Sequence, residues 1–374
     1  MSEWKEVSLS ELGKTITGKT PSSQYPEDFG DEVPFITPSD SFEKKYISRS
    51  ERYLSRLGSD RLKDKIISSD SIMVTCIGSA MGKVAKNSLP SVTNQQINSI
   101  IVNENFDSDY IYYLFKNNYA VFRNAASGST AIPILNKTDF DNLRFKVELD
   151  LNQQRKMVSI LSKIDAKIEI NNQINQELEA MAKTLYDYWF LQFDFPDQNG
   201  KPYKSSGGKM VYNPEREREI PEGWEVEKLS HFLTIKNGKD HKHLQDGKFA
   251  VYGSGGIMRT VTDYLYSGES ILFPRKGTLN NVMYVNEKFW TVDTMFYSEV
   301  NKNNSALYVF YSVKDIDFNK LNTGTGVPSM TSSILYDLNI IVPEENILEK
   351  FNTIVKRNYE TIKLNNIQNQ ELTQ

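Results

Sequence analysis

The sequence predicts an α+β protein built as an internal duplication, with two globular domains and two long helices. Between residues 151 and 191, apolar residues or Asn recur at alternating steps of four and three, without Pro or Gly. Residues 168–178 return as residues 362–372 at a constant offset of 194. Short strand-like runs separated by Gly and Pro turns fill the remaining segments, which is typical of an α+β domain. These three observations together predict the fold class.

The composition bounds the size, compartment and partners of the protein. At 374 residues the chain exceeds one ordinary core, and about two or three domains are expected. An apolar content of 39% supplies buried cores, so we expect a globular protein without a membrane span or signal peptide. A single cysteine, Cys76, excludes an intramolecular disulfide and fits the cytoplasm. A net charge of -4 argues mildly against an autonomous nucleic-acid binder but permits local basic loops.

The elements follow in order along the chain. In the first domain, strands are predicted at 70–78, 82–87 and 97–103, and a short helix with an Asp cap at 109–116. The long helix then begins, and a polar connector rich in Gly and Pro separates it from the second domain. We place the boundaries at 1–148 for the first domain, 149–192 for the first long helix, 193–223 for the connector, 224–343 for the second domain and 344–374 for the second long helix.

The second half repeats the plan of the first. Residues 325–328 correspond to 130–133, and Leu338 corresponds to Leu143, both at an offset of 195. Ser270 and the apolar run after it correspond to Ser71 and its run. Similar spacing across several elements predicts a duplication in which insertions are confined to loops.

A search for catalytic motifs finds little. The chain has three histidines, and His241 with His243 would form at most half a metal site, since no thiol or further histidine supports it. Residues 251–256 resemble a nucleotide-binding glycine loop, but the next element is a strand rather than a helix. A Walker sequence and the Asp/Asn-Pro-Pro-aromatic tetrapeptide of amino-methyltransferases are both absent from the sequence. ATP hydrolysis and methyl transfer by this chain are therefore not expected.

The loops carry polar and basic residues beside glycines. Arg, Asn and Gln side chains match base edges, whereas Lys and backbone N–H groups suit phosphates. Ordinary solvated turns are the alternative for each loop taken alone, but comparable turns in both halves favour a binding function. The candidate DNA-binding residues are Lys19, Thr20, Ser22, Ser79, Lys83, Asn94, Gln95, Gln96, Ser129, Thr130, Lys239, His241, Lys242, Arg275, Lys276, Thr278, Asn280, Asn281 and Thr325.

Asparagines interrupt the apolar seam of both long helices. Buried Asn at a helical seam fixes register and partner at some cost in stability, while a solvated polar stretch is the alternative. We expect the two helices to pack on each other with the asparagines setting their alignment. The candidate packing residues are Ile164, Ile168, Asn171, Asn175, Leu178, Ile362, Asn365, Asn369 and Leu372.

The duplicated halves, the long helices, and the central segments 185–196, 200–212 and 220–226 resemble the specificity subunit of type I restriction-modification systems. Segments 251–258, 271–278 and 289–296 also look like recurring strands and turns of that family, so the resemblance covers essentially the whole chain. It implies two tandem target-recognition domains separated by two long antiparallel helices with pseudo-twofold symmetry.

The resemblance also implies a non-catalytic reader of a bipartite double-stranded DNA target, in which helix length sets the gap between the half-sites. Two methylation subunits and a restriction subunit would be its partners, and S-adenosylmethionine, ATP and magnesium would bind to them rather than to this chain. A self-contained DNA adenine methyltransferase and a coiled-coil adaptor that binds protein are the alternatives. The second helix is shorter than the first, so we expect either asymmetric binding of the methylation subunits or assembly with another copy or fragment.

Overall fold

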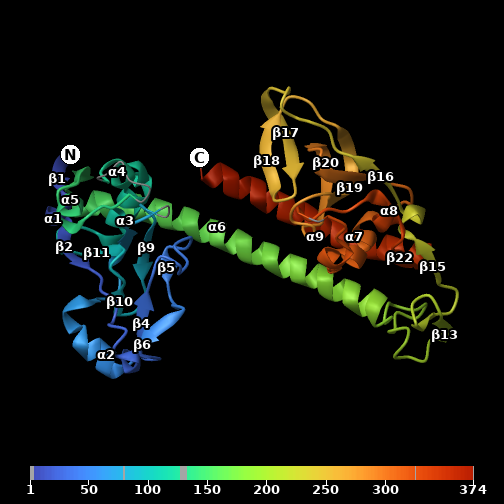
Figure 1. Ribbon diagram of the computed structural model, residues 1–374, viewed down its shortest axis with the longest axis horizontal. Helices are drawn as coiled ribbons and strands as arrows, with labels where there is room; N and C mark the ends of the chain where they lie inside the picture. The colour runs from blue at the N-terminus through green and yellow to red at the C-terminus, as the bar shows by residue number, and fades with distance from the viewer. Residues whose placement is uncertain (1–3, 79–80, 127–132, 325, 374) are drawn as a thin grey trace. The chain divides into compact units, whose positions relative to one another are not determined.

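The computed structural model describes residues 4–78, 81–126, 133–324 and 326–373. The chain divides into two compact units, Met1–Ala166 and Lys167–Gln374. The long helix α6 (Leu151–Tyr186) starts in the first unit and continues into the second (Figure 1). Within the described residues, we find no helix that combines the length and apolar character needed to cross a membrane.

The first unit contains two five-stranded sheets and one strand pair, with β10 on β4 and β9 on β5 parallel and the other pairs antiparallel. Its strands are β1 (Trp4–Ser8), β2 (Gly13–Thr17), β3 (Phe29–Gly30), β4 (Val33–Ile36), β5 (Tyr46–Ile47), β6 (Arg52–Leu54), β7 (Ile66–Ile67), β8 (Ile72–Thr75), β9 (Val84–Asn87), β10 (Ser91–Thr93), β11 (Ile97–Val102) and β12 (Arg144–Glu148). The sheet orders are β2-β11-β8-β9-β5 and β3-β6-β4-β10-β7, and β1 pairs with β12. Strand β8 is buried along its whole length, as its continuous apolar run predicts.

The helices of this unit supply much of its aromatic core. They are α1 (Leu9–Leu12), α2 (Arg56–Arg61), α3 (Ser108–Asn117), α4 (Tyr119–Asn124) and α5 (Lys137–Asp141), with 3-10 turns η1 (Pro26–Asp28) and η2 (Lys63–Lys65). Phe115 and Phe122 pack edge to face with ring centroids 5.4 Å apart. The predicted helix at 109–116 is confirmed as α3. Its cap is Asp107, whose side chain accepts from the N–H groups of Asp109 and Tyr110.

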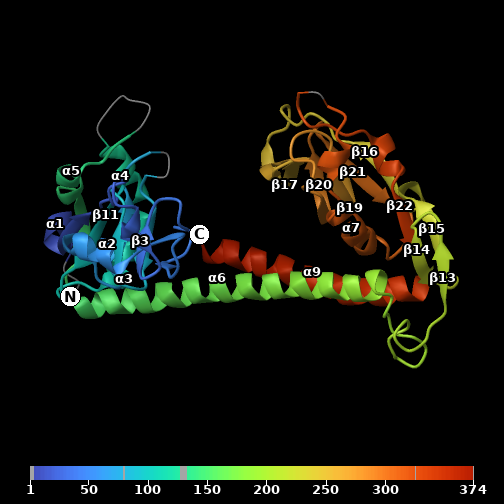
Figure 2. The ribbon, with the colours of Figure 1, turned by 60° about the horizontal axis from the view of Figure 1, so that its bottom comes forward.

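The second unit is built on a six-stranded sheet in the order β16-β21-β19-β20-β17-β18, in which β17 and β20 are parallel. Two strand pairs accompany it, β13 with β14 and β15 with β22, and Figure 2 shows them at one edge of the unit. The strands are β13 (Met210–Asn213), β14 (Arg218–Pro221), β15 (Glu225–Lys228), β16 (Leu233–Asn237), β17 (Asp246–Gly253), β18 (Gly256–Val261), β19 (Tyr266–Pro274), β20 (Met283–Thr291), β21 (Met295–Val300) and β22 (Asn339–Val342).

Aromatic residues from the end of α6 and from the connector enter the core of the second unit. After α6 the chain forms a π-helical turn, η3 (Asp187–Leu191), that buries Trp189 and Phe190. Phe195 stacks on Trp224 with ring centroids 4.9 Å apart. The connector, which its polar composition marks as a linker, is therefore anchored by its aromatic residues.

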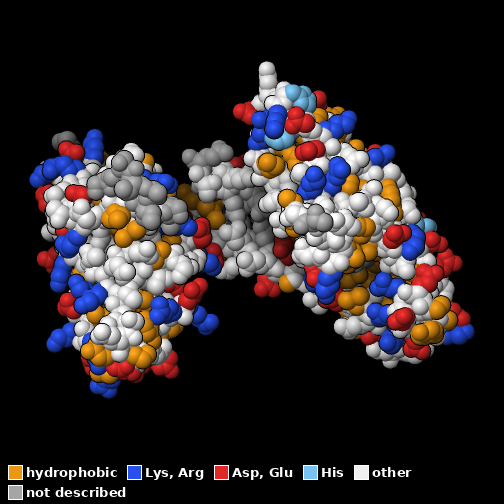
Figure 3. Space-filling model, in the orientation of Figure 1, with side chains coloured by type: hydrophobic (Ala, Val, Ile, Leu, Met, Phe, Trp, Pro, Cys, Tyr) orange, Lys and Arg blue, Asp and Glu red, His pale blue; other side chains and the backbone are white. Residues whose placement is uncertain are grey.

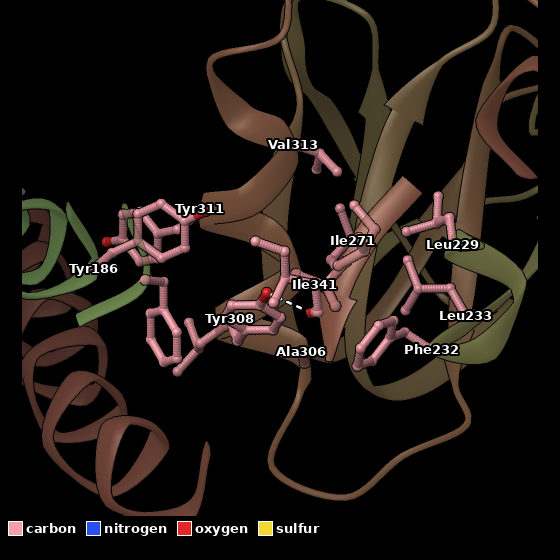
Figure 4. Close-up of a cluster of buried hydrophobic side chains, with 14 of the residues drawn as sticks. Tyr186, Leu229, Phe232, Leu233, Ile271, Ala306, Tyr308, Tyr311, Val313 and Ile341 are labelled. Atoms are coloured by element: carbon pink, nitrogen blue, oxygen red, sulfur yellow. Dashed lines mark hydrogen bonds between the residues drawn. The ribbon is translucent and has the colours of Figure 1, made fainter. Parts of the chain in front are cut away.

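The remaining helices of the second unit pack around the same core. They are α7 (Ala306–Lys314), α8 (Ser332–Tyr336) and α9 (Glu345–Leu372), with 3-10 turns η4 (Leu229–His231) and η5 (Phe318–Leu321). Tyr308 of α7 is buried and donates its hydroxyl to Ile341 O at 2.6 Å, as Figure 4 shows. This bond satisfies the polar end of an otherwise apolar cluster.

The two long helices pair in the second unit through buried asparagines, as predicted. Asn171 is fully buried and Asn175 nearly so. Asn171 Nδ2 donates to Asn369 Oδ1 at 2.8 Å. Asn365 Nδ2 donates to Asn175 Oδ1 at 2.8 Å. Residue numbers rise along α6 as those of their partners fall along α9, so the helices are antiparallel, and both views show them side by side (Figures 1 and 2).

These bonds obey an internal twofold symmetry. Asn175 Nδ2 donates to Asn366 Oδ1 and Asn369 Nδ2 donates to Asn172 Oδ1, both at 2.9 Å. The 194-residue repeat converts each of these bonds into the other, and does the same for the pair described above. The seam is less uniform elsewhere, because Leu161 is exposed. The other predicted packing residues, Ile164, Ile168, Leu178, Ile362 and Leu372, are half-buried.

The duplication includes one strand pair in each unit. Leu9 N donates to Leu143 O, and Leu229 N donates to Leu338 O, both at 2.8 Å. The pairing of β1 with β12 is therefore repeated by β15 with β22. The offset is 220 residues at Leu9 but 195 at Leu143, so the first unit holds extra residues between these points.

Candidate nucleic-acid interface

A glycine and a lysine follow β2 and form a turn that rests on the end of β10. Gly18 N donates to Ile97 O at 3.1 Å, and Lys19 N donates to Thr93 O at 2.8 Å. A Cβ atom at Gly18 would lie 2.2 Å from Thr93 O, so a side chain does not fit there. The turn exposes the Lys19 side chain to solvent.

The second unit forms the same turn after β16. Gly238 N donates to Met295 O and Lys239 N donates to Thr291 O, both at 2.9 Å. A Cβ atom at Gly238 would lie 2.0 Å from Val292 O. Lys239 is exposed, like Lys19. Each unit thus presents one lysine from an equivalent, tightly fixed turn.

A second pair of loops is held together in the same way in both units. Gly78 N donates to Pro133 O at 3.1 Å, and Gly277 N donates to Pro328 O at 3.0 Å. Both glycines have a positive φ, +83° and +90°, which favours glycine over other residues. The predicted correspondence of residues 130–133 with 325–328 is confirmed at Pro133 and Pro328.

The turns after β10 and β20, on which the two lysine turns rest, are joined to these glycine loops by a further repeated hydrogen bond. Cys76 N donates to Gln96 O at 2.7 Å in the first unit. Arg275 N donates to Thr294 O at 2.8 Å in the second. In each unit the turn after β2 or β16, the turn after β10 or β20, and the turn after β8 or β19 therefore meet at one place.

Most of the predicted residues of the first unit that the structure describes lie in this group of turns. Thr20 Oγ1 donates to Gln95 Oε1, which ties the turn after β2 to the turn after β10. Asn94 Nδ2 donates to Gln96 Oε1 at 3.1 Å. Gln95 is exposed and Asn94 is largely buried. Gln95 is therefore better placed for base contact than Asn94, which fixes the turn.

Two other candidates of this unit stand apart from that arrangement. Lys83 Nζ donates to Glu43 Oε1 at 3.0 Å, so its charge is partly compensated. Ser22 is exposed on the loop after Lys19, where its Oγ accepts from Gln24 N. Ser79, Ser129 and Thr130 lie outside the described residues.

In the second unit the turn after β19 exposes two adjacent cations, Arg275 and Lys276. Lys276 N donates to Thr294 O at 3.2 Å, so the backbone of this turn is fixed while the side chain extends outward. Thr278 and Asn280 are exposed on the same turn.

Asn281 has a structural use that its sequence context does not predict. Its Nδ2 donates to Ser254 O at 2.8 Å, joining the turn to the β17–β18 hairpin. The Asn281 side chain is half-buried, so a direct base contact is a poor assignment for it. Thr325 lies outside the described residues.

The loop after Lys239 lies against β17, β18 and β20. Trp290 Nε1 donates to Lys239 O at 2.9 Å. Arg259 donates to His241 O at 3.1 Å, and the ring of His243 lies 6.1 Å from that of Trp290. Lys242 is exposed between the two histidines. Within the described residues, no group of three or more His, Cys, Asp or Glu side chains is placed to hold a metal ion.

Cys76 is a buried, inert thiol beside the group of turns in the first unit. Burial raises its pKa to about 12, despite hydrogen bonding by Asn98. A thiol with so high a pKa is a poor nucleophile at neutral pH. Its role in the fold is that of a small apolar side chain.

Sequence reasoning missed the two glycines that fix the lysine turns and the β17–β18 hairpin beside Arg275. The signal for the first was present, because Gly18-Lys19 and Gly238-Lys239 each follow a strand near the start of a repeat. The signal for the hairpin was weak, since its contact with Asn281 bridges residues 27 positions apart.

The comparison with known families decides the identity of this two-unit arrangement. Residues 1–180 and 221–374 match the model of the type I restriction modification DNA specificity domain. The chain belongs to this family. Its role is DNA target recognition within a type I restriction-modification system, and it is not itself an enzyme.

Individual members of the family match over different lengths. The type I restriction enzyme MjaIX specificity subunit of Methanocaldococcus jannaschii is 29% identical, over 96% of this chain and 88% of that protein. The HindI specificity subunit of Haemophilus influenzae is 37% identical over 43% of this chain and 36% of that one. The S subunit of M. genitalium shares the fold with a TM-score of 0.61 at 17% identity, covering 100% of this chain and 93% of the other.

Proposed function

We propose that this specificity subunit reads a bipartite double-stranded DNA target, with one half-site bound by the group of turns in each unit. The observation that carries the proposal is that the two groups are built from equivalent hydrogen bonds and each exposes a lysine at an equivalent point. Backbone-fixed turns with exposed cations suit phosphate contacts, and neighbouring amide side chains suit base edges. We also place the protein in the cytoplasm, where a single free thiol stays reduced.

The same proposal assigns two methylation subunits and a restriction subunit as protein partners. Two pairs of apolar residues, equivalent under the 194-residue repeat, are exposed on the long helices. Ile160 corresponds to Ile354, and Ile170 corresponds to Leu364. Single exposed apolar side chains are common on protein surfaces, but their recurrence at equivalent positions of both long helices favours a repeated partner surface. Equivalent surfaces on α6 and α9 support two copies of one partner.

The chemistry would then reside on those partners. S-adenosylmethionine would bind to the methylation subunits, and ATP with magnesium would serve the restriction subunit. The residues of this chain position DNA for them. Reconstitution with the methylation subunits followed by methylome sequencing tests the whole proposal, because it should yield one two-part motif. Methylation without a two-part motif would contradict it.

Lys276→Ala is expected to weaken DNA binding to all sequences and to lower the slope of log K against log salt by about 1, because one phosphate contact is lost. Binding is measured by fluorescence anisotropy of the assembled complex at several salt concentrations. Lys204→Ala is the matched control, since Lys204 is an exposed lysine of the connector. Equal salt slopes for the two variants would show that Lys276 makes no phosphate contact.

Ile170→Asp combined with Leu364→Asp is expected to abolish binding of both methylation subunits, and each single change to remove one copy. A charge on an apolar contact surface must be desolvated when the partner binds. Both side chains are more than half exposed, at 51% and 67%, so the fold should tolerate the change. Light scattering of the reconstituted complex gives the stoichiometry. Leu57→Asp on α2 is the control, and retention of two copies by the double variant would refute this assignment.

A further inference from the structure

Two large apolar side chains project into solvent beside the cationic turn of the second unit. Ile257 and Met258 on β18 are 63% and 60% exposed, whereas Val251 and Val261 of the same hairpin are fully buried. Figure 3 shows hydrophobic, basic and histidine side chains together over β17 and β18, with acidic ones among them. Packing in the core therefore does not explain why large apolar residues occupy positions 257 and 258.

The turn of the β17–β18 hairpin packs directly on the turn that carries Arg275 and Lys276. Asn281 Nδ2 donates to Ser254 O at 2.8 Å. A Cβ atom at Gly277 would lie 2.9 Å from Ser254 Oγ, so the two turns touch where a glycine permits it. The end of the hairpin is thus fixed beside the exposed cations.

The loop containing Lys239 holds the hairpin from another direction. The guanidinium of Arg259, one residue after Met258, donates to the backbone carbonyls of His241 and Leu244. The apolar pair therefore lies between two cationic loops, one with Lys239 and Lys242 and one with Arg275 and Lys276. Both loops belong to the proposed DNA interface, so the apolar pair is continuous with it.

A β-bulge exposes both residues at once. In the hairpin Tyr252 pairs with Ile257 and Val251 pairs with Arg259, which leaves Met258 as an extra residue. Neighbouring residues of a regular strand point to opposite faces, but a bulge re-aims a side chain. Bulges are common beside functional sites, and here the bulge leaves two consecutive apolar side chains exposed.

The first unit differs at this place. Asn94 N donates to Ile36 O and Val292 N donates to Tyr252 O, so β4 is the equivalent of β17. The segment after β4 is a polar turn, in which Thr37 N donates to Asp40 Oδ2 at 2.7 Å. The two units thus share the framework of turns but present different chemistry at its edge, as readers of different half-sites should.

We propose that the β17–β18 hairpin enters the major groove and that Ile257 and Met258 determine specificity by contacting the C5-methyl group of thymine in the second half-site. The inference rests on the proposed DNA-reading function. The major groove admits a two-stranded β-ribbon, and the thymine methyl is the base-edge group that apolar side chains recognise. The flanking lysines and arginine would contact phosphates on either side of that base.

Replacing thymine by uracil in the target tests this contact, because uracil lacks the methyl group and keeps the base-pairing edge. Binding is measured with the complete methylation complex and DNA that carries the target identified by methylome sequencing. Each thymine of both half-sites is replaced in turn. Loss of one buried methyl contact should raise Kd roughly fourfold at one or two positions of the second half-site. The Ile257→Ala, Met258→Ala double variant should bind thymine and uracil targets equally there, while keeping the uracil sensitivity of the first half-site.

Leu57→Ala is the matched control, since it also shortens an exposed apolar side chain and should retain the uracil effect of the wild type. The inference is overturned if the second half-site contains no A·T pair. It is also overturned if the wild-type complex still binds its target specifically but no uracil in that half-site changes its Kd. Loss of methylation-subunit binding by the double variant also overturns it, by making the pair a protein contact. Absence of any target-specific binding by the wild-type complex refutes the proposed function instead.

Discussion

Phe190→Ala is expected to lower the free energy of unfolding of the second unit by about 3–5 kcal/mol, the usual cost of removing a buried phenylalanine ring. Phe190 is 2% exposed. Its ring centroid lies 4.6 Å from that of Tyr308 and 5.0 Å from that of Phe351, the latter at an interplanar angle of 87°. One ring from the π-helical turn after α6 thereby contacts both α7 and α9, and its loss leaves a cavity between that turn and the two helices.

Urea denaturation followed by tryptophan fluorescence measures this effect, because Trp189, Trp224 and Trp290 all lie in the second unit. Tyr188→Ala is the control. Tyr188 is also in the π-helical turn but is exposed, so its replacement should change the free energy by no more than about 0.5 kcal/mol. Equal midpoints for the two variants would show that the aromatic cluster does not hold α6 to the unit.

Lys86→Met is expected to cost the first unit about 3 kcal/mol, near the lower end of the range for breaking a buried ion pair. Lys86 is fully buried on β9, and its Nζ lies 2.6 Å from Asp70 Oδ1 and 2.5 Å from Asp109 Oδ1. Methionine leaves both carboxylates without this cation. The lower end of the range applies because Asp70 is about half exposed and Lys45 still pairs with Asp109 at 2.8 Å.

The effect should depend on pH through Asp109. Burial alone would raise the pKa of this carboxyl, but hydrogen bonds from Lys45 and Lys86 outweigh burial and hold the pKa below its ordinary value of 3.8. A lowered pKa gives stability that is present above the unfolded-state pKa and is lost as pH falls through the folded-state value. The wild type should therefore lose this stability below about pH 4, whereas the variant, which has less of it to lose, should show a smaller loss over the same pH range.

Thermal unfolding between pH 3 and pH 7 measures the prediction, and two further variants sharpen it. Lys137→Met removes a partly exposed lysine from an i,i+4 pair with Asp141 and should cost about 0.3–0.5 kcal/mol. Adding Asp109→Asn to Lys86→Met should restore part of the loss, because the unpaired carboxylate is removed. A double variant less stable than Lys86→Met would contradict the ion-pair account.

Local patterns were enough to predict much of this fold. The seam of α6 and the buried run at β8 depend on residues near one another in the chain, so periodicity identifies them. The repeat of 194 residues is visible in the order of the residues alone. The asparagines were predictable as packing residues for the same reason, since they occupy seam positions where an apolar residue would be more stabilising. The candidate lysines were predictable because they lie in short polar turns, where charged side chains are usually exposed.

Other features depend on contacts between distant residues and needed the tertiary structure. The sequence predicts Asn281 as a base-reading residue, whereas in the structure its amide donates to Ser254 O. Lys86 carries no sequence signal of burial, because the carboxylates that stabilise its charge, Asp70 and Asp109, lie 16 and 23 positions away. The connector is polar by composition, yet its aromatic residues close the core of the second unit.

The sequence by itself determined the family, the two-unit plan and the long helices, because repeats and heptads are encoded in local order. Only the tertiary structure decided which polar side chains are free to meet DNA and which are used to hold turns together. It also decided that Ile257 and Met258 are exposed, since a bulged pairing with β17 sets their direction. The physical reason is that hydrogen-bond partners and burial are set by residues brought together on folding.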